Sequence, residues 1–265
     1  MRFSEHLKKA SLVGAFFVSV LFQMQAVALC RADRSLTQVD VARVVDGDTV
    51  RLVDGRSVRL IGLDTPELGR KGRSDEPFAV VARQRLQALV DASGGRLGLM
   101  VGRQAKDHYG RTLAHLFGVG GENLEAALLA EGVGFFVAIA PNTRFADCHQ
   151  AAEQQARLAR KALWRRSPSI SPEHIRTTGF ALVTANVERF ERNRGGLWLV
   201  LQGPLVVHIP RQAAADFKER DLEQLVGRSV EVRGWVVDRK THGKTAQQAR
   251  WMVRVSHPSM LRLMD

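Results

Sequence analysis

The sequence predicts a mainly β protein with flanking helices, built as two small barrels in succession. Segments that alternate apolar and polar residues recur at short intervals through both halves of the 265-residue chain. Helical segments follow or interrupt these strands in each half, which is typical of compact α+β units. A stretch rich in serine and proline, RRSPSISPEH at 165–174, separates the two halves.

The first half contains five predicted strands and three predicted helices. The strands are expected at about 37–45, 48–53, 57–63, 97–103 and 112–119. The helices are expected at about 77–92, 123–131 and 143–164. Five strands with helices beside them favour a five-stranded OB-type barrel, because closure removes exposed strand edges.

The second half has a similar order of elements, with three strands, a helix and two strands, and this order predicts a second OB-like barrel. These elements are expected at 180–189, 197–201, 205–209, 213–225, 229–237 and 249–255. Trp198, Trp235 and Trp251 lie on its strands, either as a stacking platform for single-stranded nucleic acid or as core, and we favour core. The expected organisation is a targeting segment at 1–28, a first barrel domain at 37–165, a linker at 166–177 and a second domain at 178–265.

The chain is strongly basic, with 39 Lys and Arg against 27 Asp and Glu and a formal net charge of +12. This balance favours polyanions such as nucleic acid or anionic membrane surfaces, although a basic solvated surface explains it as well. With 25% charged and 45% hydrophobic residues, the composition excludes a disordered protein.

The first 28 residues have the pattern of an export signal. A basic start is followed by an apolar run that ends in Ala26, Val27 and Ala28, small residues of the kind a signal peptidase requires. We expect cleavage after Ala28 and a periplasmic or secreted protein. Two alternatives are an uncleaved membrane anchor and lipidation of Cys30, and membrane association is expected only in those cases.

Export decides how the two cysteines, Cys30 and Cys148, are interpreted. In an oxidising compartment they are expected to pair in a disulfide, and the alternative is two unlinked thiols. Neither a zinc site nor a cysteine nucleophile is expected from this pair, because one of the cysteines lies at the mature terminus. The sequence indicates no stable protein partner.

The densest charge lies at 46–67, DGDTVRLVDGRSVRLIGLDTPE, around a predicted hairpin. Asp48 and Asp64 could supply carboxylates to a hard divalent cation such as Ca²⁺, with the Thr65 carbonyl beside them. Arg59 suits a phosphate, because its planar guanidinium donates in a fork. A two-residue turn would place Asp48 and Arg59 on one face, whereas a three-residue loop with a bulge at Gly55 would place them on opposite faces.

Two further residues complete a hydrolytic set. Arg111, in DHYGRTLAHLF, could neutralise charge on the same phosphate during in-line attack. Glu67 could accept a proton from the attacking water or orient it. Each motif alone also fits an ordinary turn or ion pair, and their joint occurrence is what favours metal-assisted hydrolysis of a phosphodiester.

The motifs VVDGDTV, VRLIGLDTPE and DHYGRTLAHLF, in this order over residues 40–165, resemble the staphylococcal nuclease (thermonuclease) family. The resemblance implies an OB-fold barrel that hydrolyses DNA and RNA with Ca²⁺ and leaves 3′-phosphates. The implied roles are Asp48, Asp64 and the Thr65 carbonyl as Ca²⁺ ligands, Arg59 and Arg111 as phosphate clamps, Glu67 as catalytic carboxylate, Tyr109 as a substrate contact and Asp46 as a supporting acid.

The sequence departs from the family pattern at Ala138 and Ala140, where the prototype has tyrosines that help to bind the nucleotide. The expected function is an exported Ca²⁺-dependent nuclease acting on DNA and RNA, with nucleotide contacts that differ from those of the family prototype. The alternatives are a non-catalytic module that binds single-stranded nucleic acid, and a structural envelope protein whose basic surface meets anionic lipid or polymer.

Overall fold

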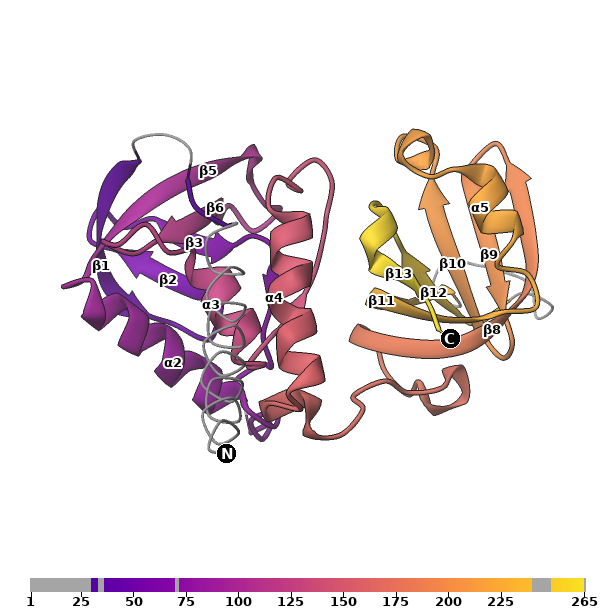
Figure 1. Ribbon diagram of the computed structural model, residues 1–265, viewed down its shortest axis with the longest axis horizontal. Helices are drawn as coiled ribbons and strands as arrows, with labels where there is room; N and C mark the ends of the chain where they lie inside the picture. Colours follow the sequence, from indigo (N-terminus) through magenta and orange to yellow (C-terminus); the bar gives the residue numbers. More distant parts are fainter. Residues whose placement is uncertain (1–29, 33–35, 70–71, 240–248, 265) are drawn as a thin grey trace, which may run out of the picture.

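The computed structural model describes residues 30–32, 36–69, 72–239 and 249–264. Two lobes lie side by side, one formed by the described residues up to Arg165 and the other by the described residues from Gly179 onward (Figure 1). The targeting segment expected at 1–28 lies outside the described residues. None of the helices within the described ranges is long and apolar enough to cross a membrane.

The first lobe is a closed five-stranded barrel in the order β1-β2-β3-β6-β5. Its strands are β1 (Thr37–Val44), β2 (Thr49–Leu52), β3 (Ser57–Leu60), β5 (Arg96–Lys106) and β6 (Thr112–Phe117). The pair β3 and β6 is parallel, whereas the other neighbours are antiparallel. The apolar positions of each alternating segment point inward, as in Val58 and Leu60, which are 0% and 2% exposed.

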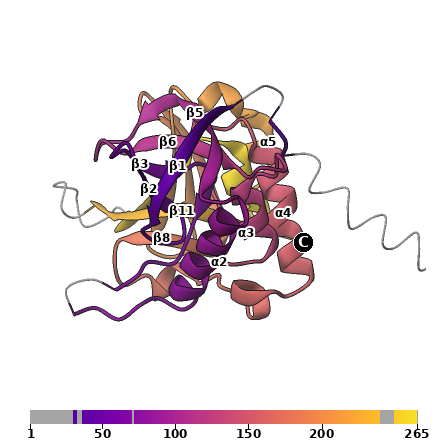
Figure 2. The ribbon, with the colours of Figure 1, turned by 90° about the vertical axis from the view of Figure 1, so that its left-hand side faces the viewer.

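Three helices lie beside the barrel (Figure 2), and a short two-stranded sheet completes this lobe. They are α2 (Ala79–Ala92), α3 (Leu124–Ala130), α4 (Ala146–Leu158), β4 (Leu63–Asp64) and β7 (Phe135–Phe136). The pairing of Asp64 with Phe135 brings the end of the charged hairpin to the segment that follows α3. This pairing fixes one side of the candidate site.

The second lobe is also a closed barrel. Its six-stranded sheet runs β12-β10-β9-β8-β11-β13, and an added pairing of β12 with β11 closes five of the strands. The strands are β8 (Gly179–Asn193), β9 (Gly196–Leu201), β10 (Leu205–Pro210), β11 (Ser229–Asp238), β12 (Trp251–Arg254) and β13 (Leu261–Leu263), with helix α5 (Glu219–Glu223) between β10 and β11. The predicted fold class of two successive barrels with flanking helices is confirmed.

Two predicted helices are wrong in length. The helix expected at 143–164 ends at Leu158, because Arg160 has a left-handed backbone (φ +49°), and only a 3₁₀ turn follows at Ala162–Arg165. The helix expected at 213–225 is divided into a 3₁₀ turn at Ala214–Asp216 and α5 by the extended backbone of Phe217.

The three tryptophans of the second barrel have different environments. Trp251 is core, as expected, with 3% exposure. The expectation is wrong for Trp235, which is 38% exposed because it alternates outward between buried neighbours on β11. Trp198 is half-buried on the outer face of β9, and its ring stacks on His208 with centroids 3.9 Å apart.

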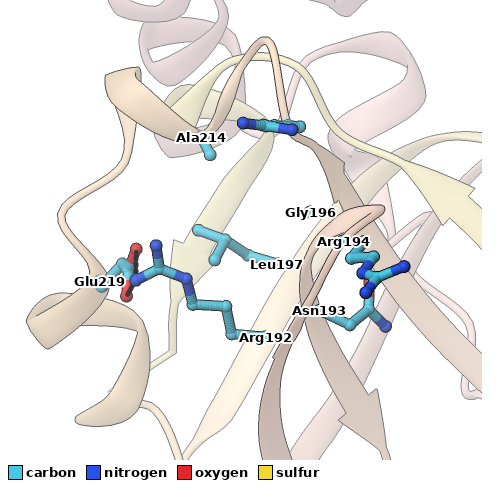
Figure 3. A pocket seen from close by; sticks show the side chains of 8 residues that line it. Arg192, Asn193, Arg194, Gly196, Leu197, Ala214 and Glu219 are labelled. Atoms are coloured by element: carbon cyan, nitrogen blue, oxygen red, sulfur yellow. Dashed lines mark hydrogen bonds and ion pairs between the residues drawn. The ribbon is translucent and has the colours of Figure 1, made fainter.

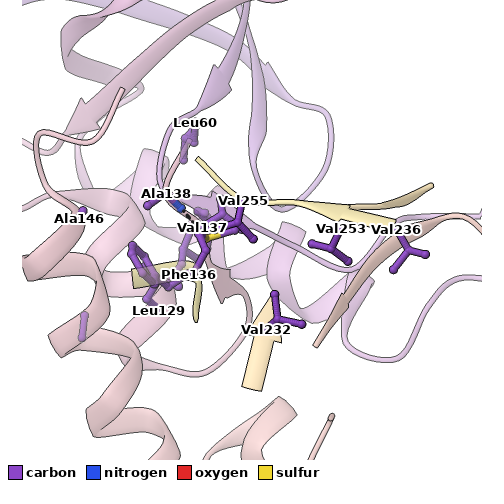
Figure 4. Packing of buried hydrophobic residues seen from close by; sticks show 14 of the residues in the cluster. Leu60, Leu129, Phe136, Val137, Ala138, Ala146, Val232, Val236, Val253 and Val255 are labelled. Atoms are coloured by element: carbon purple, nitrogen blue, oxygen red, sulfur yellow. Dashed lines mark hydrogen bonds between the residues drawn. The ribbon is translucent and has the colours of Figure 1, made fainter. Parts of the chain in front are cut away.

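The two barrels share one hydrophobic core. A single cluster of buried apolar residues extends from β1 to Met260. Figure 4 shows Phe136, Val137 and Ala138 of the first lobe beside Val255 of the second. The backbone N–H of Ala138 donates to the Met260 sulfur at 3.0 Å. Because the segment after β7 is buried by the second barrel, the barrels form one packed unit at this junction.

Four charged residues bridge the same junction. Glu153 and Arg157 lie on α4, and Glu231 and Arg233 lie on β11. Arg157 Nη2 contacts Glu231 Oε1 at 2.7 Å, and Arg233 Nη1 contacts Glu153 Oε2 at 2.8 Å. Arg233 Nη1 also donates to the carbonyl of Phe136 at 3.0 Å. Alternating charges with complete hydrogen bonding make such a buried cluster tolerable, whereas loss of one member leaves a buried charge without compensation.

Acid is expected to weaken this junction. Burial raises the pKa of Glu231, but the hydrogen bonds and charges of Arg157 and Arg233 outweigh it, so the net pKa lies below the ordinary value of 4.5. A carboxyl group with a lowered folded-state pKa contributes stability above about pH 4.5 and loses it as the pH falls through the folded-state pKa. The free energy of unfolding, measured by denaturant titration, should therefore fall more steeply below pH 4.5 in wild type than in Glu231→Gln.

A matched control is Glu191→Gln, which removes an exposed carboxylate that pairs with Arg189 on the same barrel. This variant should keep the acid slope of wild type. Equal slopes in wild type and Glu231→Gln would show that the junction does not depend on this ionisation.

Candidate active site

The charged hairpin is built with a three-residue loop. Leu52 and Arg56 are joined by a backbone hydrogen bond of 2.9 Å, and the loop between them ends at Gly55 with φ +87°. The register places Thr49 opposite Arg59, so Asp48 lies opposite Leu60. Strand alternation alone would therefore point the side chains of Asp48 and Arg59 to opposite faces of the sheet. Asp48 nevertheless reaches Arg59, because it lies in the bend before β2, where strand alternation does not apply.

Asp48, Arg59, Asp64 and Thr65 are in direct contact. Arg59 Nη2 lies 3.1 Å from Asp48 Oδ2 and 2.7 Å from Asp64 Oδ1. Asp48 Oδ2 also accepts hydrogen bonds from the backbone N–H and the hydroxyl of Thr65, each at 3.0 Å. The side chains are largely buried, at 13% exposure for Arg59 and 7% for Asp48. The structure therefore brings together four residues that lie up to 17 positions apart.

The electrostatics of this cluster are dominated by carboxylates. Burial and the neighbouring charge of Asp48 raise the pKa of Asp46 to about 6. Burial, with the charges of Asp48 and Glu67, raises the pKa of Asp64 to about 7 although Arg59 opposes the rise. One guanidinium thus does not offset the negative charge around it, and the cluster attracts a further cation.

Glu67 stands at the exposed edge of the cluster. Its backbone N–H donates to Glu76 Oε2 at 2.9 Å, which ties the chain after the hairpin to the turn before α2. The charge of Glu67 acts on both Arg59 and Asp64. A carboxylate that is solvent-accessible and close to the cluster is suitably placed for proton transfer with water.

Arg111 and Tyr109 come from the loop that enters β6. The strands β3 and β6 pair in parallel with Arg59 opposite Leu113, and Arg111 lies two residues before Leu113, just outside β6. Its guanidinium Nε pairs with Asp107 Oδ2 at 2.7 Å, and Tyr109 lies under the guanidinium with its ring centroid 5.4 Å from Cζ. Within the described ranges, no hydrogen bond or ion pair joins Arg111 directly to the Asp48 cluster.

The expected disulfide is present between Cys30 and Cys148, with Cα atoms 5.7 Å apart. It fastens the first described residue of the chain to α4, and both cysteines are buried. The pairing places no residue in the charged cluster, so its contribution is to the support of the fold.

Comparison with known proteins agrees with this geometry. A family model described as staphylococcal nuclease homologue matches residues 57–166. The thermonucleases of Staphylococcus hyicus and Staphylococcus intermedius are 32% and 33% identical over 127 and 129 residues, covering 47% and 48% of this chain and 73% and 75% of those proteins. The chain belongs to the staphylococcal nuclease family.

The coverage of these matches is partial. Endonuclease YncB of Bacillus subtilis strain 168 is 31% identical over 139 residues, which are 51% of this chain and 64% of that protein. The chain thus spans less than two thirds of this relative. The staphylococcal nuclease model begins at residue 57, so it contains Arg59, Asp64 and Glu67 but not Asp48, and it ends before the second barrel.

The donor set of this family member fits a divalent metal. Asp46, Asp48 and Asp64 offer only hard oxygen donors. Their combined negative charge exceeds the positive charge of the Arg59 guanidinium, on which all three act. Asp48 and Asp64 would hold the cation, with Thr65 beside them. Asp46 orders the bend, because its Oδ1 accepts the backbone N–H of Asp48 at 3.2 Å.

Ala138 and Ala140, which we expected to depart from the family pattern, lie at the domain junction. Ala138 is 2% exposed and covered by Met260, and the backbone N–H of Ala140 donates to Ser256 Oγ at 3.1 Å. Side chains as large as tyrosine would collide with the second barrel at Ala138. This family member therefore gives this segment to the domain junction.

Two residues near the site were not predicted from the sequence. Asp107 holds both the backbone and the guanidinium of Arg111, and Glu76 holds the backbone of Glu67. The signal for Asp107 was present, since an aspartate at the start of D-H-Y-G-R commonly accepts backbone N–H groups two and four residues later. Glu76 acts across a nine-residue separation that no local pattern reveals.

The second barrel carries a separate basic cavity of 530 Å³ (Figure 3). Arg192, Arg194 and Arg211 line it, together with the edge of the core at Leu197. Arg192 pairs with Glu219 at 2.9 Å. In the described part of the chain, Arg194 and Arg211 have no carboxylate partner, so the cavity carries excess positive charge.

Proposed function

We propose that the protein is an exported nuclease that hydrolyses phosphodiester bonds of DNA and RNA with Ca²⁺. The observation that carries this proposal is the contact of Asp48, Arg59 and Asp64. In this cluster the negative charge of the carboxylates exceeds the single positive charge of the Arg59 guanidinium. A binding module has no need for buried carboxylates that repel the phosphate backbone, whereas a metal-dependent hydrolase does. The names of the thermonuclease and endonuclease relatives support the same reaction.

Each residue of the site has a defined task in this reaction. Arg59 and Arg111 donate to the non-bridging oxygens of the scissile phosphate and stabilise the charge that builds there. Glu67 accepts a proton from water while the water oxygen forms its bond to phosphorus. The bond from phosphorus to the 5′-oxygen breaks in line with the attack, and the departing 5′-oxygen takes up a proton from solvent. A strand with a 3′-phosphate and a strand with a free 5′-hydroxyl result.

When bound between Asp48 and Asp64, Ca²⁺ would supply Lewis-acid polarisation of the phosphate and positive charge against the carboxylates. Hydrogen bonds within the protein fix the side chains of Asp48 and Arg59 in place. Thr65 fixes one oxygen of Asp48 through two hydrogen bonds, and Arg59 Nη1 donates to the carbonyls of Leu60 and Leu63 at 2.9 and 2.7 Å. These contacts hold the side chains in place before substrate arrives.

Export is part of the proposal and rests on the basic and apolar pattern of residues 1–28, with cleavage after Ala28. A disulfide between Cys30 and Cys148 is stable in the periplasm or outside the cell and rare in the cytosol. The proposed substrates, DNA and RNA, also agree with the formal charge of +12.

Ca²⁺ dependence is tested by incubating the purified protein with single- and double-stranded DNA and RNA, in Ca²⁺ or in EGTA. Cleavage in Ca²⁺ should fall at least about 10²-fold in EGTA, because the carboxylates then repel the phosphate. Asp64→Asn should show the same loss in Ca²⁺, whereas Asp91→Asn, at an exposed position near the C-terminal end of α2, should be as active as wild type. Equal cleavage in Ca²⁺ and EGTA would contradict the proposed cofactor.

The alternative is a non-catalytic module that binds single-stranded nucleic acid. The basic cavity lined by Arg192, Arg194 and Arg211 favours it, because arginines around a hollow suit a phosphate backbone. The assay above separates the two functions. Retention of nucleic acid without cleavage in Ca²⁺ would establish the module and exclude the enzyme.

A further inference from the structure

A row of aromatic side chains crosses the junction between the two barrels. Phe135 lies on β7 of the first lobe, and Phe180 and Trp235 lie opposite each other on β8 and β11 of the second. The rings of Phe135 and Phe180 are stacked with centroids 5.4 Å apart. The rings of Phe180 and Trp235 meet edge to face, also at 5.4 Å. We call these three residues the aromatic row, and none of them has a task in the proposed hydrolysis.

One end of the aromatic row lies beside the aspartate cluster. Phe135 is directly opposite Asp64 in the pairing of β4 with β7, so the two side chains leave this small sheet on the same side. The neighbouring pair, Leu63 and Phe136, takes the other side, and both residues are 0% exposed. Phe135 itself is only half-buried. The row therefore begins next to a carboxylate of the proposed active site and continues onto the second barrel.

The other end of the row is open to solvent. Trp235 is 38% exposed, and Val237, two residues later on the same face of β11, is 36% exposed. Phe180 and Phe135 are half-buried, so each ring of the row contributes to one apolar surface. A connected apolar surface of this kind, unlike a single exposed side chain, is typical of a binding site.

The chemistry around the row suits an unpaired nucleic-acid strand. The ring of Trp164 meets that of Phe135 at 5.5 Å. Two exposed arginines, Arg165 and Arg166, follow Trp164 directly in the chain. Bases of any identity stack on aromatic rings, and arginines bind the phosphates between them. The bases of a duplex are already stacked and paired, so only a single strand offers them to the row.

We propose that the aromatic row stacks unpaired bases of the substrate strand next to the phosphate held at the aspartate cluster. The substrate class is then single-stranded DNA or RNA, and the second barrel takes part in binding it. This inference rests on the proposed function for the identity of the strand. The position of the row relative to Asp64 is fixed, because Ala138, three residues after Phe135, contacts Met260 of the second barrel.

The test measures binding of a fluorescein-labelled single-stranded DNA to the full chain by anisotropy in EDTA, so that cleavage does not interfere. Trp235→Ala should raise the Kd about fivefold or more, as expected for the loss of one stacked base. Trp235→Phe should restore most of the affinity, because it keeps a ring. Trp198→Ala is the matched control, since Trp198 lies on the outer face of β9 and stacks on His208, and it should bind as wild type. Circular dichroism checks the folding of each variant.

A second measurement needs no substitution. A strand of the same length with abasic sites in place of its bases keeps the phosphates, so wild type should bind it about fivefold more weakly or less tightly still. The proposal is overturned if wild type binds both strands equally, or if Trp235→Ala binds the base-bearing strand as wild type does. A wild-type dimer that dissociates in Trp235→Ala, together with equal binding of the two strands, would assign the row to contact between two copies of the chain. These measurements do not depend on cleavage in Ca²⁺, so the row and the proposed hydrolysis can fail separately.

Discussion

The Glu67→Gln variant is expected to lower the turnover number on DNA by about 10²- to 10⁴-fold, the range for loss of a general base. The amide keeps the size of the side chain but cannot accept the proton of the attacking water. Because Glu67 is exposed, the melting temperature should change little. Single-turnover cleavage of a short labelled strand at saturating Ca²⁺ measures the effect on the chemical step.

Glu188→Gln is the matched control, since Glu188 is an exposed carboxylate on the second barrel, far along the chain from the site. Its turnover number should equal that of wild type. A Glu67→Gln variant with undiminished turnover would remove Glu67 from its proposed role and leave water activation to another group.

The Arg111→Ala variant is expected to lose about 3–4 kcal/mol of transition-state stabilisation, by analogy with removal of a single oxyanion donor. The loss should fall mainly on the turnover number and not on KM, because the charge on the equatorial oxygens increases only as the reaction proceeds. Arg111→Lys should restore part of the activity, since an ammonium keeps the charge but lacks the planar fork.

Arg83→Ala controls for a general loss of positive charge, because Arg83 is exposed on α2. Its kinetics should match those of wild type. A rise in KM with unchanged turnover in Arg111→Ala would show that Arg111 binds substrate in the ground state only, and would contradict its proposed task.

Local patterns were sufficient for the fold and for much of the site. Alternation over two residues predicted nearly all barrel strands, because each strand has one face in the core. The sequence also predicted the contact among Asp48, Arg59 and Asp64, although its register argument left two loop lengths open. The structure has the three-residue loop, and Asp48 still contacts Arg59 because Asp48 precedes the strand.

Features that depend on distant segments were not predictable. Glu153 and Arg157 form the helical ion pair that their spacing predicts, at 3.1 Å, but Arg157 also pairs with Glu231, 74 residues later. Similarly, His115 and Glu125 meet because the N-terminus of α3 packs behind β6. The exposure of Trp235 follows from its outward position on β11, and α4 ends at Leu158, before the left-handed backbone of Arg160.

The shared core of the two barrels gives the second domain a defined place beside the proposed active site. Phe135 of β7 pairs with Asp64, and Ala138, two residues after β7, contacts Met260 of the second barrel. A change in the second barrel can therefore reach the aspartate cluster through three consecutive residues, Phe136, Val137 and Ala138 (Figure 4).

The most direct test of the proposed function is a crystal structure of the protein with Ca²⁺ and a nucleotide that carries two phosphates. The account predicts one cation bound by Asp48 and Asp64, with Arg59 and Arg111 donating to the same phosphate and Glu67 within hydrogen-bond reach of a water facing its phosphorus. A phosphate bound only at the arginines of the second barrel, with no cation at the aspartates, would contradict it.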